Sequence, residues 1–190
     1  MSNHALQEAA AVSELAAAIY LKAPSAELIN ELKSVFTDPE EFSEEPLNLL
    51  LEEYHELFFN PVSTHFICPF ESFAREQRYW GEAAIDVREY YRQAEFDPQS
   101  LRSEVYWKNQ RMPDQIGFEM AFFSALLKSA EAQADAADEL LKTARMFHTE
   151  HINSWMGEYG ARLQREARTS LYRLLGTLTC EVAEISLEEG

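Results

Sequence analysis

Apolar side chains recur every three or four residues through most of this chain, which is the spacing of one face of an α-helix. The clearest stripe consists of Leu47, Leu50, Leu51, Tyr54, Leu57 and Phe58. Only 6 Gly and 7 Pro occur among the 190 residues, and Val, Ile and Thr are few beside Ala, Leu and Glu, so the composition favours helices over a turn-rich β fold. We therefore predict an all-α helical bundle. The length suits one domain, which we expect to span residues 1–190.

The predicted helices follow one another along the whole chain, and prolines mark several of their ends, as at Asp38-Pro39. Pro113 is expected at the first helical position of the most apolar helix, with Asp114 next to the positive end of the helix dipole. Because that helix is apolar on all sides, it belongs at the centre of the bundle. The expected helical ranges are 5–21, 25–35, 47–58, 70–96 with a break at Gly81, 113–131, 141–159 and 163–188.

Two segments are not expected to be helical. Residues 61–69 contain two prolines and mixed β-branched residues, which predicts an ordered loop of a length that is often functional. Residues 97–112 are polar and irregular, but they include Tyr106 and Trp107, which are unusual for a solvated loop. We expect these two rings to fold back on the surface.

The charge of the chain restricts the partners that it can bind. It has 33 acidic and 16 basic residues, a formal net charge of -17, so its long-range field repels phosphate backbones and anionic lipid headgroups. Nucleic acids and membrane surfaces are therefore poor partners. A cationic peptide would be steered toward the protein, although the same charge also serves solubility alone.

The cysteine content and the N-terminus indicate the compartment. Cys68 and Cys180 are far apart in the sequence and form no metal-type pair, which suggests neither a disulfide framework nor a zinc site. Residues 1–11 lack the basic start and apolar stretch of a secretory leader, and no segment is apolar for long enough to span a bilayer. We expect a cytoplasmic protein in a reducing environment.

The histidines offer at most a weak metal site. His148 and His151 lie three residues apart on a predicted helix, so both rings could reach one metal ion. A zinc site normally needs three or four protein ligands, and only folding could bring His55 or His65 close. Packing or a capping hydrogen bond is the better interpretation, and no resident metal or other cofactor is predicted.

No residue pattern supports catalysis. Neither Ser72 nor Cys68 lies in a recognisable nucleophile turn, and the glycines form no phosphate-binding loop. The acidic pairs, such as Glu52-Glu53, are expected on solvated faces and turns, because Glu is abundant throughout the chain. We therefore expect a protein that is not an enzyme.

Aromatic and acidic residues are dense at two non-helical points, residues 66–73 and 107–114. Ordinary core packing would explain them. The alternative is an apolar groove with an acidic rim, which would suit a peptide that has a hydrophobic run beside basic residues.

Several segments, in order, are similar to the TorD/DmsD family of redox-enzyme maturation chaperones. Glu53-Tyr54-x-x-Leu57-Phe58-x-x-Pro61 and Pro69-Phe70-Glu71-Ser72 resemble the segments before and after the family's loop, and Pro113-Asp114-Gln115-Ile116-x-x-Glu119 resembles its Pro-Asp-His helix start. The C-terminal matches are Phe147-x-x-x-His151-Ile152-x-x-Trp155 and Leu171-Tyr172-Arg173-x-Leu175. Gln115 departs from the family's usual His; it can donate and accept hydrogen bonds but cannot become cationic.

The resemblance implies an all-α chaperone that binds the twin-arginine leader of a molybdoenzyme catalytic subunit. It would hold the subunit until the molybdopterin cofactor is inserted, and so delay export, acting as a monomer or a homodimer. The aromatic residues would bury the apolar run of the leader, and Asp114 or Glu119 would face its arginines. The residues expected at the site are Phe70, Ser72, Trp80, Asp114, Gln115, Glu119, His151 and Trp155.

Two other functions remain open on the residues alone. One is a small metal- or nucleotide-dependent enzyme that uses His148, His151 and nearby carboxylates. The other is a generic helical adaptor. Metal analysis would separate the enzyme from the chaperone, and a leader-peptide pull-down would separate the adaptor.

Overall fold

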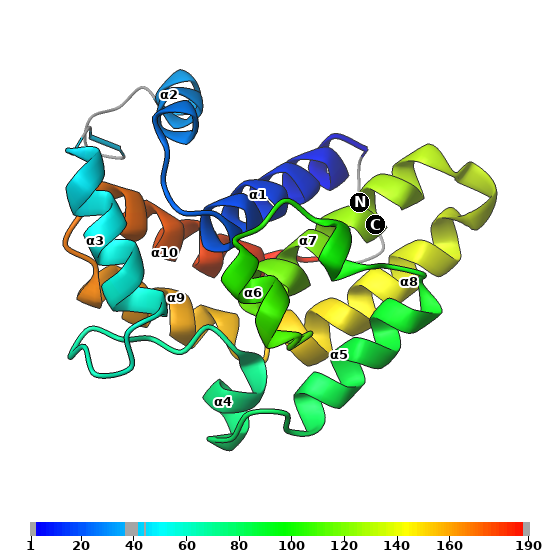
Figure 1. Ribbon diagram of the computed structural model, residues 1–190. Coiled ribbons are helices and arrows are strands. Elements are labelled where there is room, and N and C mark those ends of the chain that lie inside the picture. The colour runs from blue at the N-terminus through cyan, green and yellow to red at the C-terminus, as the bar shows by residue number, and fades with distance from the viewer. Residues whose placement is uncertain (1–2, 37–41, 44, 188–190) are drawn as a thin grey trace.

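The computed structural model describes residues 3–36, 42–43 and 45–187. Over these residues the chain forms ten α-helices and no β-strand, which confirms the all-α prediction (Figure 1). The helices are α1 (Asn3–Leu21), α2 (Ala26–Val35), α3 (Leu47–Phe58), α4 (Glu71–Glu76), α5 (Glu82–Gln93), α6 (Val105–Gln110), α7 (Ile116–Ala132), α8 (Ala137–Phe147), α9 (Met156–Glu166) and α10 (Ser170–Glu184).

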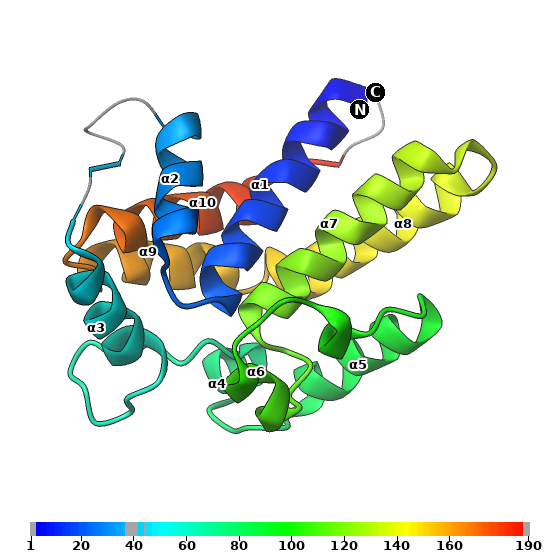
Figure 2. The same ribbon diagram turned by 45° about the horizontal axis from the view of Figure 1, so that its top comes forward.

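The helices pack in two layers around α1 and α7. Helix α1 lies beside α7, α8 returns along α7, and the pair α9 and α10 packs against α1 (Figures 1 and 2). Helices α4, α5 and α6 cover one end of this arrangement, and α2 and α3 lie at another side (Figure 2). No helix in the described ranges is long and apolar enough to cross a membrane.

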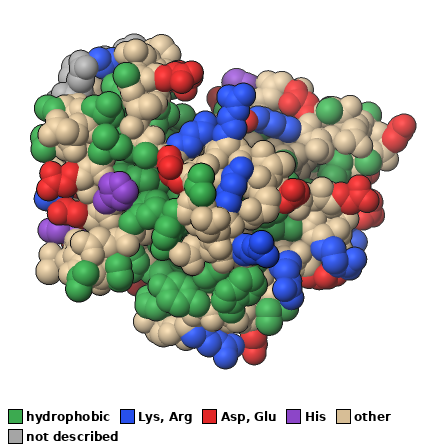
Figure 3. Space-filling view, viewed as in Figure 1, with side chains coloured by type: hydrophobic (Ala, Val, Ile, Leu, Met, Phe, Trp, Pro, Cys, Tyr) green, Lys and Arg blue, Asp and Glu red, His purple; other side chains and the backbone are tan. Residues whose placement is uncertain are grey.

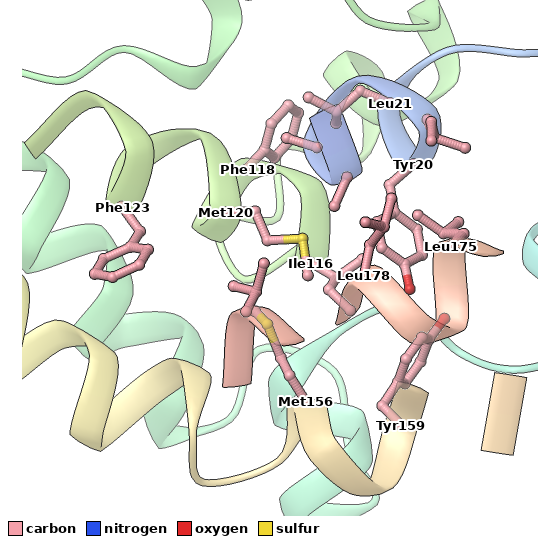
Figure 4. Packing of buried hydrophobic residues seen from close by; sticks show 14 of the residues in the cluster. Tyr20, Leu21, Ile116, Phe118, Met120, Phe123, Met156, Tyr159, Leu175 and Leu178 are labelled. Carbon is pink, nitrogen blue, oxygen red and sulfur yellow. The ribbon is translucent and has the colours of Figure 1, made fainter. Parts of the chain in front are cut away.

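The centre of the core is formed where α1, α7, α9 and α10 meet. Figure 4 shows Tyr20, Met120, Met156, Tyr159 and Leu178 converging from these helices, and all of them are buried. The Tyr20 hydroxyl pairs with the Thr179 hydroxyl at 2.7 Å, so its polar atom is satisfied inside the core. Most of α7 is buried, as expected for a helix that is apolar on all sides.

Two glycines allow α9 and α10 to cross closely. A Cβ atom at Gly160 would lie 2.8 Å from the carbonyl oxygen of Gly176, and a Cβ atom at Gly176 would lie 2.8 Å from the carbonyl oxygen of Gly160. Since these are backbone atoms that cannot rotate away, the crossing requires the absence of a side chain at both positions.

The predicted start of the most apolar helix is wrong. Helix α7 begins at Ile116, and Pro113 and Asp114 precede it in a turn. The Gln115 side chain caps the helix, because its Oε1 accepts hydrogen bonds from the backbone N–H groups of Gly117 at 2.7 Å and Phe118 at 3.2 Å. Asp114 instead accepts the backbone N–H of Ser72 at the start of α4.

The C-terminal part also differs from the predicted ranges. The expected helix through 141–159 is interrupted by a π-helical turn at His148–Ile152 and by the extended φ of -149° at Trp155. Leu163 belongs to α9, and the last helix starts at Ser170. A pattern of apolar residues continues across such breaks because both sides of the bend face the same core. The predicted end at Glu188 and the turn at Asp38-Pro39 lie outside the described residues.

The structure differs from the predictions for the two segments before α7, residues 70–96 and 97–112. The break near Gly81 is present, but α4 already ends at Glu76 and α5 starts after Gly81. Residues 97–112 are not wholly irregular, since they contain α6. Trp107 is 1% exposed in the core, where its Nε1 donates to the Tyr54 hydroxyl at 3.1 Å, and only Tyr106 remains at the surface.

Candidate functional site

The two aromatic and acidic segments of the sequence meet in the fold. Phe70 and Gln115 form an antiparallel bridge, in which the Glu71 N–H donates to the Asp114 carbonyl at 3.0 Å and the Ile116 N–H donates to the Pro69 carbonyl at 2.9 Å. We call the paired segments 69–72 and 113–116 the junction. This pairing engages the backbone of Asp114 and Ile116 outside the helical hydrogen bonds and therefore fixes where α7 can begin.

A cluster of buried polar side chains lies at the junction. Glu71, Asp114 and Glu119 are each 0% exposed. Glu71 accepts from Arg75 and pairs with Nδ1 of the buried His151 at 2.9 Å. The indole N–H of Trp155 donates to Glu119 Oε2 at 3.3 Å. Helices α4, α7 and the π-helical turn thus contribute to one polar cluster.

Burial shifts the acid–base properties of this cluster. Desolvation, followed by the neighbouring Glu71 and Asp114 carboxylates, raises the pKa of Glu119 well above its ordinary value. Desolvation also raises the pKa of Asp114, although the hydrogen bonds from Ser72 oppose the shift. A proton on Glu119 therefore relieves repulsion among three carboxylates that are shielded from water.

The cluster retains unused hydrogen-bonding capacity. Within the described residues, five of its polar side-chain atoms have no partner: Ser72 Oγ, Asp114 Oδ1, Gln115 Nε2, Glu119 Oε1 and His151 Nε2. Buried polar atoms without partners reduce stability, so this part of the interior is not optimised for stability alone. Gln115 caps the helix through its side-chain oxygen alone. A neutral amide oxygen is a sufficient acceptor for these hydrogen bonds.

An open cleft of about 910 Å³ lies next to the junction, between residues 61–68, α4 and the first turns of α9. Its wall exposes polar and apolar groups in similar measure, and Trp155 connects it to the polar cluster through the hydrogen bond to Glu119. The cleft-lining apolar and aromatic residues are Pro61, Phe66, Ile67, Cys68, Phe73, Ala74, Tyr79, Trp155 and Tyr159. The predicted ordered loop therefore supplies one wall of the cleft.

The charges in the cleft do not form the acidic rim that the sequence suggested. The charged lining residues are Arg75, Glu158 and Arg162. Arg75 is held by Glu71 and by the Glu150 carbonyl at 3.1 Å, and Arg162 donates to the Phe66 carbonyl at 3.1 Å. Glu158 is exposed and its carboxylate makes no hydrogen bond or ion pair within the described chain. It is therefore the charge most available to a ligand.

Exposed apolar side chains continue from the cleft over α4 and α6, where Figure 3 shows them gathered at the surface. Tyr79, which lines the cleft, is 49% exposed, and Trp80, Val105 and Tyr106 are also exposed. Trp80 has a φ of 57°, which is unusual for a bulky residue. Its side chain is about half exposed, so part of the indole is accessible to solvent.

The structure divides the predicted site residues into three groups. Ser72, Asp114, Gln115 and Glu119 are 0% exposed at the junction, and Phe70 and His151 are also buried there. Trp155 is buried but lines the cleft, and Trp80 lies on the exposed apolar surface. In this conformation Asp114 and Glu119 do not reach the surface, so neither carboxylate can face a bound peptide directly. Their assignment to the site remains a prediction.

Sequence reasoning missed several residues of the cleft wall. Phe66 and Phe73 are predicted only as part of a dense aromatic segment, and neither Tyr159 nor Glu158 is among the predicted site residues. The spacing of Glu158, Tyr159 and Arg162, at three and four residues, places them on one face of α9, and Trp155 lies at the N-cap of that helix. This spacing predicts that the residues share one face of a helix, but spacing alone does not distinguish an exposed face from a buried one.

The two histidines of the enzyme alternative lie in separate environments. His148 Nε2 bonds the Val182 carbonyl at 2.9 Å, and His151 bonds Glu71. Burial lowers the pKa of His148, which favours its neutral form. In the described ranges, no three His, Cys, Asp or Glu side chains are grouped so that they could hold a metal ion.

Comparison with known proteins gives a family and a fold. The family model for the nitrate reductase delta subunit matches residues 18–160. None of the curated proteins compared with the chain matches it. A crystal structure of a proposed redox enzyme maturation protein from Archaeoglobus fulgidus superposes with a TM-score of 0.58 at 14% identity, over 93% of this chain and 94% of that one. At this identity the structure shows the shared fold.

Proposed function

Because the chain belongs to the nitrate reductase delta subunit family of TorD-like chaperones, we propose that it binds the twin-arginine leader of a molybdoenzyme catalytic subunit. Family and fold indicate a maturation chaperone for an enzyme of the nitrate reductase type. The chaperone holds the subunit in the cytoplasm until the molybdopterin cofactor is inserted, and thereby delays its export. The proposal depends on the cleft beside the junction.

The cleft suits the apolar run of a leader. Its volume of about 910 Å³ accommodates several side chains, and aromatic residues from the loop, α4 and α9 line it. Transfer of one large apolar side chain from water into such a wall contributes roughly 1.5–3 kcal/mol. The exposed surface around Tyr79 and Trp80 extends the apolar contact beyond the cleft.

The basic part of the leader meets the free carboxylate of Glu158. Since Arg75 and Arg162 are already held by protein acceptors, they do not compete with the leader for Glu158. The net charge of -17 adds a long-range attraction that speeds association.

The predicted site residues act in two ways under this proposal. Trp80 and Trp155 contact the leader, because one is exposed and the other lines the cleft. Phe70, Ser72, Asp114, Gln115, Glu119 and His151 are positioning residues that fix the junction and, through the Glu119–Trp155 bond, the cleft wall.

Calorimetric titration with a twin-arginine leader peptide tests the proposal. Glu158→Gln should weaken binding about fivefold, which corresponds to about 1 kcal/mol. Phe66→Ala should weaken it at least about tenfold, because it removes apolar contact area. A leader in which both arginines are replaced by Gln should bind the wild type and Glu158→Gln equally.

Glu139→Gln is the matched control, because Glu139 is an exposed helical carboxylate on α8, away from the cleft. It should leave the affinity unchanged. A leader that does not bind the wild-type protein, or binds all three variants as tightly as the wild type, would remove leader recognition from this cleft and favour a generic adaptor.

A further inference from the structure

Two hollows lie on either side of Phe96. One, of about 300 Å³, is bordered by α1, α7 and residues 96–102, and the other, of about 260 Å³, by α5 and residues 96–99 and 111–113. The Phe96 ring lies 5.0 Å from the ring of Tyr91 and 5.1 Å from that of Phe122. These ring contacts hold the Phe96 side chain in place between the two hollows.

Both hollows have apolar floors with basic side chains among their lining residues. The apolar lining of the first comes from Ala17, Ala18, Leu21, Leu101, Ala121 and Ala125, and that of the second from Tyr91, Met112 and Pro113, with Phe96 shared. The basic residues are Lys22, Arg102 and Lys128 in the first hollow and Arg88, Arg92 and Arg111 in the second. Figure 3 shows a band of basic side chains across this face.

Four of these basic side chains are unpaired. Lys128 pairs with Glu14 at 2.6 Å, and Arg92 pairs with Glu89 at 2.6 Å. By contrast, no side-chain hydrogen bond or ion pair holds the exposed Lys22, Arg88, Arg102 and Arg111 within the described part of the chain.

The lack of partners is not due to a shortage of acidic residues. The chain has 33 of them, and other arginines, such as Arg75, Arg78 and Arg168, have carboxylate partners. Among the described residues that line the two hollows, six are basic and one, Glu14, is acidic, so the lining carries a net positive charge on an anionic protein. Such a surface attracts an anionic partner and disfavours cationic ones.

We propose that the two hollows dock an acidic segment of a partner polypeptide, whose apolar side chains enter the hollows on either side of Phe96 while its carboxylates meet Lys22, Arg88, Arg102 and Arg111. The apolar floors favour a polypeptide over a phosphate compound, and the cations are divided between the two hollows rather than converging on one point. The leader cleft shares no lining residue with either hollow. The docking surface is therefore separate from the leader cleft.

Titration of the isotope-labelled full chain by nuclear magnetic resonance tests this surface. The probe is a helical peptide with a Leu face and a Glu face. It should shift the amide signals of residues 88–102 and not those of residues 66–79. Arg88→Glu combined with Arg102→Glu should weaken binding at least about tenfold, and salt should weaken wild-type binding because these charges are exposed.

The control variant combines Lys142→Glu with Arg165→Glu. Both are exposed basic residues that make no hydrogen bond or ion pair in the described chain and lie outside the hollows, so the net charge changes equally. It should bind the peptide as the wild type does. Peptides with Lys in place of Glu, or with Ser in place of Leu, should bind at least about tenfold more weakly.

Three results would overturn the proposal. Equal weakening by the control variant would show that only the overall charge matters. Inorganic pyrophosphate that binds the wild type and is lost in Arg88→Glu/Arg102→Glu would indicate a phosphate ligand. Sedimentation that shows a wild-type dimer, and a monomer in the same variant, would assign the surface to a second copy of the chain.

Discussion

The junction and the cleft lie on the two sides of Trp155, and they treat polar groups in opposite ways. At the junction, three carboxylates and a histidine are enclosed, although several of their atoms have no partner. In the cleft, aromatic and polar groups share the wall, and two of its three charged side chains are held by protein acceptors, which leaves Glu158 available. The buried junction can fix the local structure, whereas the open cleft can bind a ligand.

This difference separates the residues that form a motif in the sequence from those that can touch a ligand. The Pro-Phe-Glu-Ser and Pro-Asp-Gln segments pair with each other and are buried. Phe66, Phe73 and Glu158 form no motif, yet they line the open volume. Variants on either side of Trp155 should therefore change stability and binding in different proportions.

The largest expected effect is the loss of the packing beneath the junction. Trp107 is fully buried, with its ring 6.1 Å from that of Phe70. Trp107→Ala should lower the free energy of unfolding by about 3–5 kcal/mol, because it leaves a large cavity. Urea denaturation measures the loss. Trp80→Ala, at the exposed surface, should change stability by less than about 0.5 kcal/mol, and equal losses would contradict the division between the two regions.

Removal of the Asp114 carboxylate should have a smaller effect on stability. Asp114→Ala leaves the backbone N–H of Ser72 without its 2.8 Å acceptor, which should cost about 1–3 kcal/mol. If Asp114 acts by positioning the junction, the affinity for the leader peptide should fall, and Asp114→Asn, which retains an acceptor oxygen, should restore part of it. Unchanged affinity in Asp114→Ala, measured by calorimetry, would remove Asp114 from the site.

The raised pKa of Glu119 makes the stability of the junction depend on pH. Because its pKa is raised in the folded protein, the wild type binds more protons folded than unfolded above the ordinary carboxyl range, and loses stability as the pH rises toward the folded pKa. Glu119→Gln cannot ionise. Its stability relative to the wild type should therefore increase with pH, by at most about 1.4 kcal/mol per pH unit. Urea denaturation at several pH values should show this trend, and a stability difference that stays constant with pH would contradict it.

The smallest expected effect concerns the bond between the two regions. Trp155→Phe keeps an aromatic ring in the cleft but removes the N–H that donates to Glu119 at 3.3 Å. We expect a loss of about 1 kcal/mol in stability and a modest change in leader affinity. An affinity that falls as far as in Phe66→Ala would indicate that the cleft wall depends on this bond more than on apolar contact.

Much of the fold could be predicted from local patterns. The stripe from Leu47 to Phe58 forms α3 with those bounds, because a long amphipathic face at helical spacing has one stable way to bury itself. The break near Gly81 and the non-helical segment from Pro61 to Pro69 follow from the local properties of glycine and proline. The wrong predictions concern places where segments that are far apart in the sequence meet.

The start of α7 illustrates such a failure. Locally, Pro113 and Asp114 are good first residues of a helix. In the fold they form a turn, and the backbone pairing with residues 69–71 moves the start of the helix to Ile116. In the same way, nothing near Trp107 in the sequence shows that Tyr54 accepts its indole N–H. For the site, the sequence identified the two segments that meet but not Glu158, whose availability depends on what surrounds it.

The sequence by itself determined that this chain is helical, where most helices run, and which family it resembles, because these properties depend on residue types at short spacing. Only the tertiary structure decided that Asp114, Gln115 and Glu119 are enclosed while Glu158 and the cleft are open. The physical reason is that burial is a property of contacts between segments far apart in the chain. The energy of a charge depends on that burial far more than on its neighbours in sequence.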